Sequence, residues 1–157
     1  RLPKTQKNSL RMKNQRHALI VAVVCLLAGT AIYFSTRSEN ILLNQWVAHI
    51  ADGKFLQFFQ RLASNAWVPG WIMYSLPDAL WMMALTLFIL LIWDFKIHRR
   101  STVWLALAVV AGAGLEILQG FHLMRGTFDM ADLLFVLLAA SVPITITLLK
   151  QRLCASI

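Results

Sequence analysis

The sequence has few charged side chains and none of the short motifs that mark common soluble enzymes. Only 14% of the 157 residues are charged, whereas 59% are hydrophobic, a balance far from that of soluble domains. No GxSxG, HExxH, Walker or CxxC motif is present, so no serine-hydrolase, zinc-protease, phosphate-loop or dithiol site is indicated. We therefore expect an integral membrane protein that needs no cofactor.

Cysteine and histidine are also scarce. The two cysteines are Cys25, in the first apolar segment, and Cys154, near the end of the chain. They are far apart in sequence and in expected membrane depth, so we predict no disulfide. The four histidines are scattered along the chain, and we predict no metal site.

Basic residues outnumber acidic ones by fifteen to seven, and six of the fifteen lie in the first sixteen positions. A basic cluster beside an apolar segment suits anionic lipid headgroups and membrane topology. The net charge of +8 could instead indicate nucleic-acid binding, but no soluble domain remains to supply a groove-reading element. We predict membrane lipids as partners and no nucleic acid.

Four apolar segments have about the length needed to cross a hydrocarbon core roughly 30 Å thick. We predict an all-α integral membrane protein with one four-span domain over 18–149 and a basic tail at each end, 1–17 and 150–157. Apolar residues continue past the small residues Gly29 to Ala31, which favours an uncleaved first span over a signal peptide. The predicted spans are residues 18–35, 76–93, 102–119 and 128–149.

The segment at about 40–65, between the first two spans, has apolar residues at helical spacing with polar ones between them. This pattern predicts one or two amphipathic helices, broken near Asp52 and Gly53. They would lie in the membrane interface or cover the outer surface of the bundle, and the pattern does not distinguish these arrangements. The second span is predicted to begin with Ser75 as N-cap, Pro77 in the first turn and Asp78 at N3.

The distribution of Lys and Arg predicts the orientation. The two tails and the 94–101 loop carry eleven of the fifteen, and the other side carries four. Because short cytoplasmic segments are rich in Lys and Arg, both termini are predicted to be cytoplasmic. The 40–65 segment is then extracytoplasmic.

With this topology, acidic and amide side chains from three helices converge at the outer face. The predicted ligand-binding residues are Asp78, Glu116, Gln119, Arg125, Asp129 and Asp132. Since this mouth is mainly acidic, it suits a neutral or cationic ligand, or protons, better than an anion. Clustered carboxylates could also act as general acid and base or relay protons.

Structural roles compete with binding at several of these positions. Asp78, Asp129 and Asp132 lie where helix N-termini favour negative charge. Glu116 lies near a helix C-terminus, where the dipole disfavours a carboxylate, and intramembrane carboxylates usually serve a purpose. Small residues at 108, 112 and 120 share its face and would turn it inward. A structural ion pair with Arg125 is the simpler alternative.

These residues resemble the second-half signature of VanZ-like membrane proteins. The resemblance covers about residues 74–145 and rests on Glu116-x-x-Gln119, Arg125 and the two aspartates that open the final helix, with Asp78 at the family's earlier acidic position. It implies a small multi-span protein of the bacterial cytoplasmic membrane, in a family linked to glycopeptide resistance. The chain has Met82 where the family has His, and Val136 where it has Asn.

Three hypotheses follow. The first is a cell-envelope protein whose outward-facing pocket binds a lipid headgroup, an envelope precursor or an amphipathic drug. The second is a membrane-embedded hydrolase or transferase that uses paired carboxylates. The third is a structural subunit, in a homo-oligomer or a larger membrane complex, whose small-residue stripe and 40–65 segment contact partners.

Overall fold

A computed structural model describes residues 4–36, 57–58, 61, 69–123 and 129–155, and most of the predicted amphipathic segment at 40–65 lies outside these ranges. Within these ranges, four helices are long and apolar enough to cross a membrane, which confirms the predicted four-span helical fold. They are α1 (Lys4–Thr36), α4 (Gly70–Ile92), α5 (Arg99–Gly120) and α6 (Met130–Ala155). The chain is a multi-pass membrane protein.

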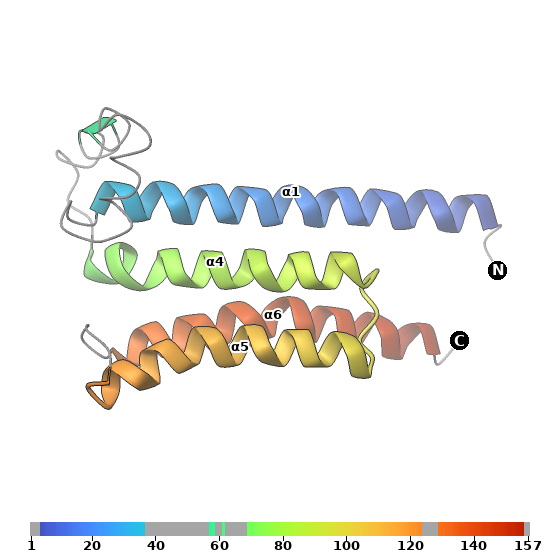
Figure 1. The fold of residues 1–157 in the computed structure, drawn as a ribbon. Coiled ribbons are helices and arrows are strands. Elements are labelled where there is room, and N and C mark those ends of the chain that lie inside the picture. Colours follow the sequence, from blue (N-terminus) through green and yellow to red (C-terminus); the bar gives the residue numbers. More distant parts are fainter. Residues whose placement is uncertain (1–3, 37–56, 59–60, 62–68, 124–128, 156–157) are drawn as a thin grey trace.

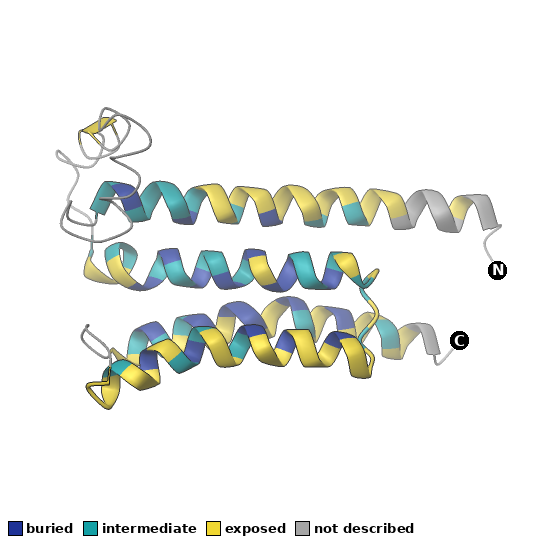
Figure 2. Cartoon of the chain, viewed as in Figure 1, coloured by how far each residue is buried: buried dark blue, intermediate teal, exposed yellow. Residues whose placement is uncertain are grey.

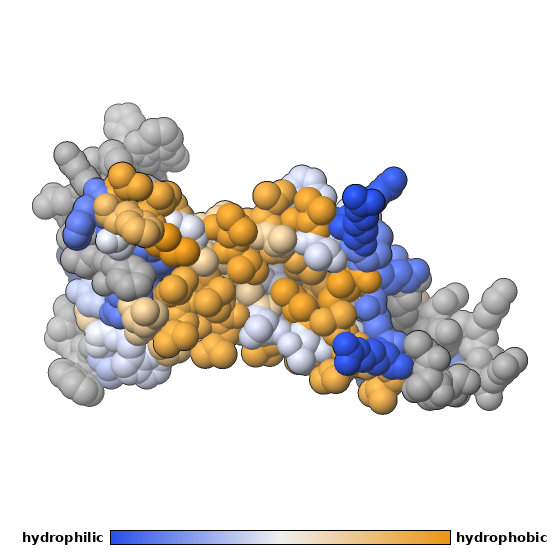
Figure 3. All heavy atoms as spheres, turned by 90° about the horizontal axis from the view of Figure 1, so that it is seen from below, coloured by the Kyte–Doolittle hydropathy of each residue, from blue (hydrophilic) through white to orange (hydrophobic). Residues whose placement is uncertain are grey.

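The helices run alternately between two ends of the bundle (Figure 1). We call one the termini end, where α1 begins and α6 ends, and the other the acidic end, where α5 ends at Gly120 and α6 begins at Met130. A band of hydrophobic residues covers the middle of the face shown in Figure 3, with hydrophilic residues toward both ends. This distribution fits a bundle whose middle is surrounded by lipid.

Helix α4 occupies the centre of the arrangement. It packs against α1 on one side and against α5 and α6 on the other, and α5 also contacts α6 (Figure 1). Its buried residues are therefore spread around the helix, whereas the middle of α1 is largely exposed (Figure 2). The exposed residues of α1 from Leu19 to Leu27 are apolar, as expected of a helix that faces lipid.

The start of α4 differs from the prediction. The helix begins at Gly70 after Pro69, whose carbonyl accepts hydrogen bonds from the first turn, so Ser75 is no N-cap and Asp78 is not at N3. Pro77 was predicted in the first turn, but it lies inside α4. Proline has no backbone N–H to bond the carbonyl four residues earlier in the helix. Here that carbonyl, of Met73, lies 3.3 Å from the Thr36 hydroxyl of α1, which also donates to the Ile32 carbonyl of its own helix over the shorter distance of 2.8 Å.

The interface between α1 and α4 depends on a glycine. A Cβ atom at Gly29 would lie 2.9 Å from Cδ1 of Trp81 and 3.1 Å from the Pro77 carbonyl oxygen, so only glycine permits this approach without a shift. The indole of Trp81 donates a hydrogen bond to the Thr30 hydroxyl over 3.2 Å. The Tyr33 ring lies 5.1 Å from the Trp81 ring between centroids.

The hydrophobic core lies between α4 and α6. It is formed by two larger side chains, Met82 and Val136, and by three alanines, Ala79, Ala139 and Ala140. Small residues allow the helix backbones to approach closely, which is how membrane helices gain van der Waals contact.

At the termini end, hydrogen bonds join α1 and α6 to the loop that follows α4. The Gln15 amide on α1 donates to the Asp94 carboxylate over 2.6 Å, and the Gln151 amide on α6 donates to the Phe95 carbonyl over 3.3 Å. Asp94 and Phe95 adopt positive φ values of 54° and 55°, which turn the chain from α4 toward α5. The loop thus connects the first and last helices as well as its own neighbours.

Candidate functional site

A glycine on α5 shows how the three acid-bearing helices meet. A Cβ atom at Gly112 would overlap the terminal methyl of Met82 on α4 and would lie 3.2 Å from Cγ1 of Val136 on α6. Residues 82, 112 and 136 therefore form one layer of contacts across the three helices, which we call the Gly112 layer.

The acids lie one helical turn from this layer. Asp78 precedes Met82 by four residues, Glu116 follows Gly112 by four, and Asp132 precedes Val136 by four. Side chains four apart share a helix face, and the alternating helix directions carry all three steps toward the acidic end. Asp78, Glu116 and Asp132 therefore lie on the next turn of α4, α5 and α6 toward the acidic end, and we call this set of positions the acid layer.

Two of these carboxylates are buried. Glu116 and Asp132 each expose only 8% of their surface, and Oε2 of Glu116 and Oδ1 of Asp132 are inaccessible. Within the described part of the chain, Asp132 Oδ1 has no hydrogen-bond partner. A buried polar oxygen that lacks a hydrogen bond costs roughly 1–3 kcal/mol, so a donor brought by a ligand or a water molecule would stabilise the site.

The remaining predicted site residues differ in position. Asp129 is exposed, and its carboxylate accepts a hydrogen bond from the Ala131 backbone N–H over 2.8 Å. It therefore caps the N-terminus of α6, which is the structural role predicted for it. Gln119 is half-buried, one turn beyond Glu116 on the same face of α5. Arg125 lies outside the described residues.

Two neighbours of the acid layer were not identified from the sequence as site residues. Ser75 is only 1% exposed and lies one turn before Asp78 and Ala79 on α4. Trp71 stacks on Phe135 of α6 with 6.0 Å between the ring centroids. The spacing of Trp71, Ser75 and Ala79 at every fourth residue was the available signal.

The hydrophobic core closes the acid layer on one side. Met82, Val136, Ala139 and Ala140 lie between the acids and the termini end. Within the described ranges, no three His, Cys, Asp or Glu side chains come together as a metal ion would require. The acid layer thus lies on the acidic-end side of the apolar core.

No family model, curated protein or solved structure matches the chain. The resemblance to VanZ-like proteins therefore rests on the residues quoted above. Met82 and Val136, two of the positions where the chain departs from that pattern, are the residues that a Cβ atom at Gly112 would meet.

Proposed function

We propose that the protein is a cell-envelope component of the bacterial cytoplasmic membrane, with both termini in the cytoplasm, and that its acid layer forms an outward-facing pocket. The pocket binds a lipid headgroup, an envelope precursor or an amphipathic drug through a neutral or cationic group. The proposal is supported by the positions of Asp78, Glu116 and Asp132, each four residues from a member of the Gly112 layer, and by the burial of Glu116 and Asp132.

Charge and chemistry favour an amine as the bound group. An ammonium group donates up to three hydrogen bonds, and the buried oxygens of Glu116 and Asp132 can accept them. Hydrogen bonds to charged groups contribute about 1.5–3 kcal/mol each. The stacked ring of Trp71, at the same end of the bundle, adds an aromatic face of the kind that attracts cations.

The apolar core favours binding from one side over transport. Met82 and Val136 fill the space beside Gly112, and the alanines of the core follow toward the termini end. This barrier separates the acids from the termini end, so a ligand enters and leaves by the acidic end. The same barrier argues against a continuous proton relay through the bundle.

The test compares retained lipids by native mass spectrometry of gently extracted protein, with phosphatidylethanolamine as the added probe and phosphatidylcholine as its methylated counterpart. The variants are Glu116→Gln and Asp132→Asn, with Asp129→Asn as the matched control. We expect wild type and the control to retain phosphatidylethanolamine preferentially, and either buried-acid variant to lose that preference by about tenfold or more.

Other outcomes separate the alternatives. Equal retention in all four proteins would contradict an amine-binding site and direct attention to protein partners retained in the same spectra. A probe that is converted by wild type, and that Glu116→Gln binds without converting, would favour the hydrolase or transferase hypothesis instead.

A further inference from the structure

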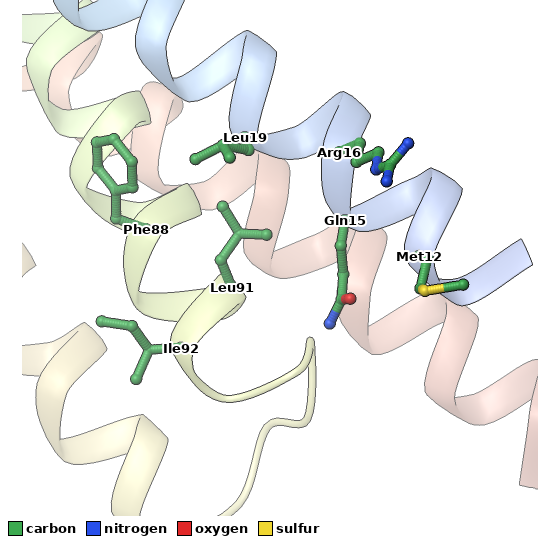
Figure 4. A pocket seen from close by; sticks show the side chains of 7 residues that line it. All are labelled: Met12, Gln15, Arg16, Leu19, Phe88, Leu91 and Ile92. Carbon is green, nitrogen blue, oxygen red and sulfur yellow. The ribbon is translucent and has the colours of Figure 1, made fainter. Parts of the chain in front are cut away.

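A groove separates α1 from α4 at the termini end, away from every residue of the acid layer. It has a volume of about 410 Å³, within the range of small-ligand sites of roughly 300–1,000 Å³. In Figure 4, Leu19 and Leu91 lie between the two helices, Gln15 turns toward the loop after α4, and Arg16 lies beyond them on α1.

The groove changes character along its length. Its apolar lining comes from Met12 and Leu19 on α1, on either side of Gln15 and Arg16, and from Phe88, Leu91 and Ile92 in the last turns of α4. Its polar end is formed by Gln15 and Arg16, at the point where the basic segment of α1 gives way to the apolar span at Ala18. Such a groove crosses the boundary between hydrocarbon and headgroups.

The charge around the polar end is positive. Arg16 is exposed, and exposed Lys13 lies three residues earlier on α1, close to the same helix face. Of the described residues at this end, Asp94 is the only acid, and its carboxylate accepts the Gln15 amide. An anionic group at Arg16 would therefore meet mainly positive charge.

We propose that this groove binds one anionic phospholipid of the membrane leaflet at the termini end, with an acyl chain along Leu19 and Ile92 and the phosphate at Arg16. The lipid completes the surface between α1 and α4 at this end. This site is independent of the acid layer and of any ligand bound there.

The test uses the full chain in nanodiscs that contain equal amounts of phosphatidylglycerol and phosphatidylcholine, followed by native mass spectrometry of the lipids retained after release. Arg16→Gln is compared with Arg99→Gln, an exposed arginine at the same end that does not line the groove. We expect the ratio of phosphatidylglycerol to phosphatidylcholine to fall about fivefold in Arg16→Gln, the effect of one basic residue at an anionic surface, and less than twofold in Arg99→Gln.

A second pair of variants tests the place of the acyl chain. Leu19→Asn puts an amide in the groove wall, whereas Ile20→Asn puts one on the neighbouring exposed position outside it. The amount of lipid retained should fall below that of wild type in Leu19→Asn and should equal that of wild type in Ile20→Asn. The proposal is overturned if the two arginine variants lose phosphatidylglycerol equally, which indicates a diffuse surface charge, or if Leu19→Asn retains the lipid as wild type does.

Discussion

Gly112 and Met82 meet where α5 packs on α4, so closely that a Cβ atom at Gly112 would overlap the terminal methyl of Met82 unless that side chain moved. The contact lies within one chain, although a glycine stripe on a membrane helix can equally serve association with a partner. Asp78 and Glu116 each lie one turn from this contact, on the helices that it joins.

Gly112→Leu should destabilise the bundle, whereas Gly114→Leu should not. At Gly112 the new side chain would meet both Met82 and Val136, but a Cβ atom at Gly114 meets nothing within 4 Å. Overpacking costs about 1–3 kcal/mol. The two variants make the same change two residues apart in one helix, so thermal unfolding in detergent isolates the effect of the contact.

Met82→Ala should relieve much of that cost, because it removes the atoms that the new leucine meets. The variants Gly112→Leu, Met82→Ala and their combination form a double-mutant cycle with an expected coupling of about 0.5–3 kcal/mol. Strictly additive effects, together with a change in oligomer size for Gly112→Leu, would instead assign the stripe to a partner.

The two aspartates that open α6 should respond differently to substitution. Asp129 caps the helix through the Ala131 N–H, so Asp129→Ala should lower stability by about 0.5–2 kcal/mol, while Asp129→Asn retains an acceptor and should change it little. Asp132 is buried, and Asp132→Asn removes a charge that is costly to desolvate.

We therefore expect Asp132→Asn to be as stable as wild type or more stable in the absence of ligand. Thermal unfolding of the three variants in one detergent checks both expectations. A large loss of stability in Asp132→Asn, comparable to that in Asp129→Ala, would mean that the ionised carboxylate holds the fold together and is no binding group.

The sequence was sufficient to predict the four helices, because each is a long apolar segment, and to predict the inward position of Glu116, because small residues share its face. It was insufficient to predict the start of α4, because the partner of the Met73 carbonyl is Thr36, from a different helix. Local capping rules favoured Ser75 as the first residue, and no local pattern shows a hydrogen bond supplied by tertiary packing.

The groove at the termini end was also beyond the reach of sequence patterns. Its walls come from α1 and α4, which are far apart in the sequence. Hydrophobic periodicity predicts each helix but not how the two helices are placed relative to each other. The register of α1 against α4 is set by the close approach of Gly29 to Trp81 and Pro77, and a lone glycine in an apolar helix does not reveal which residues it meets.

The contact between the Thr36 hydroxyl and the Met73 carbonyl should contribute about 0.5 kcal/mol, the low end of the usual net value of a hydrogen bond, because the same hydroxyl donates over a shorter distance to the Ile32 carbonyl. Thr36→Val removes the hydroxyl and leaves the Met73 carbonyl without this donor, which Pro77 cannot replace because it has no backbone N–H. The substitution should therefore destabilise the protein. In a Pro77→Ala background the backbone N–H of residue 77 can bond that carbonyl, and Thr36→Val should then have a smaller effect. Thermal unfolding of the four proteins measures the coupling, and an equal effect of Thr36→Val in both backgrounds would contradict the assignment.

Labelling of single cysteines checks the orientation on which the outward-facing pocket depends. In a background with Cys25 and Cys154 replaced by serine, a cysteine at His122 should react with an impermeant maleimide added outside intact cells. A cysteine at Arg99 should react only after the membrane is permeabilised. Both positions are exposed and lie at opposite ends of the bundle. The reagent can therefore reach either side chain in the protein itself, and a difference in labelling reports the side of the membrane.

The excess of Lys and Arg at the termini end is the physical reason for this expectation, because positively charged segments stay on the cytoplasmic side. The reverse labelling pattern would place Glu116 and Asp132 on the cytoplasmic side. The acid layer would keep its geometry, but its ligand would have to come from the cytoplasm or the inner leaflet, and an extracytoplasmic envelope precursor would be excluded.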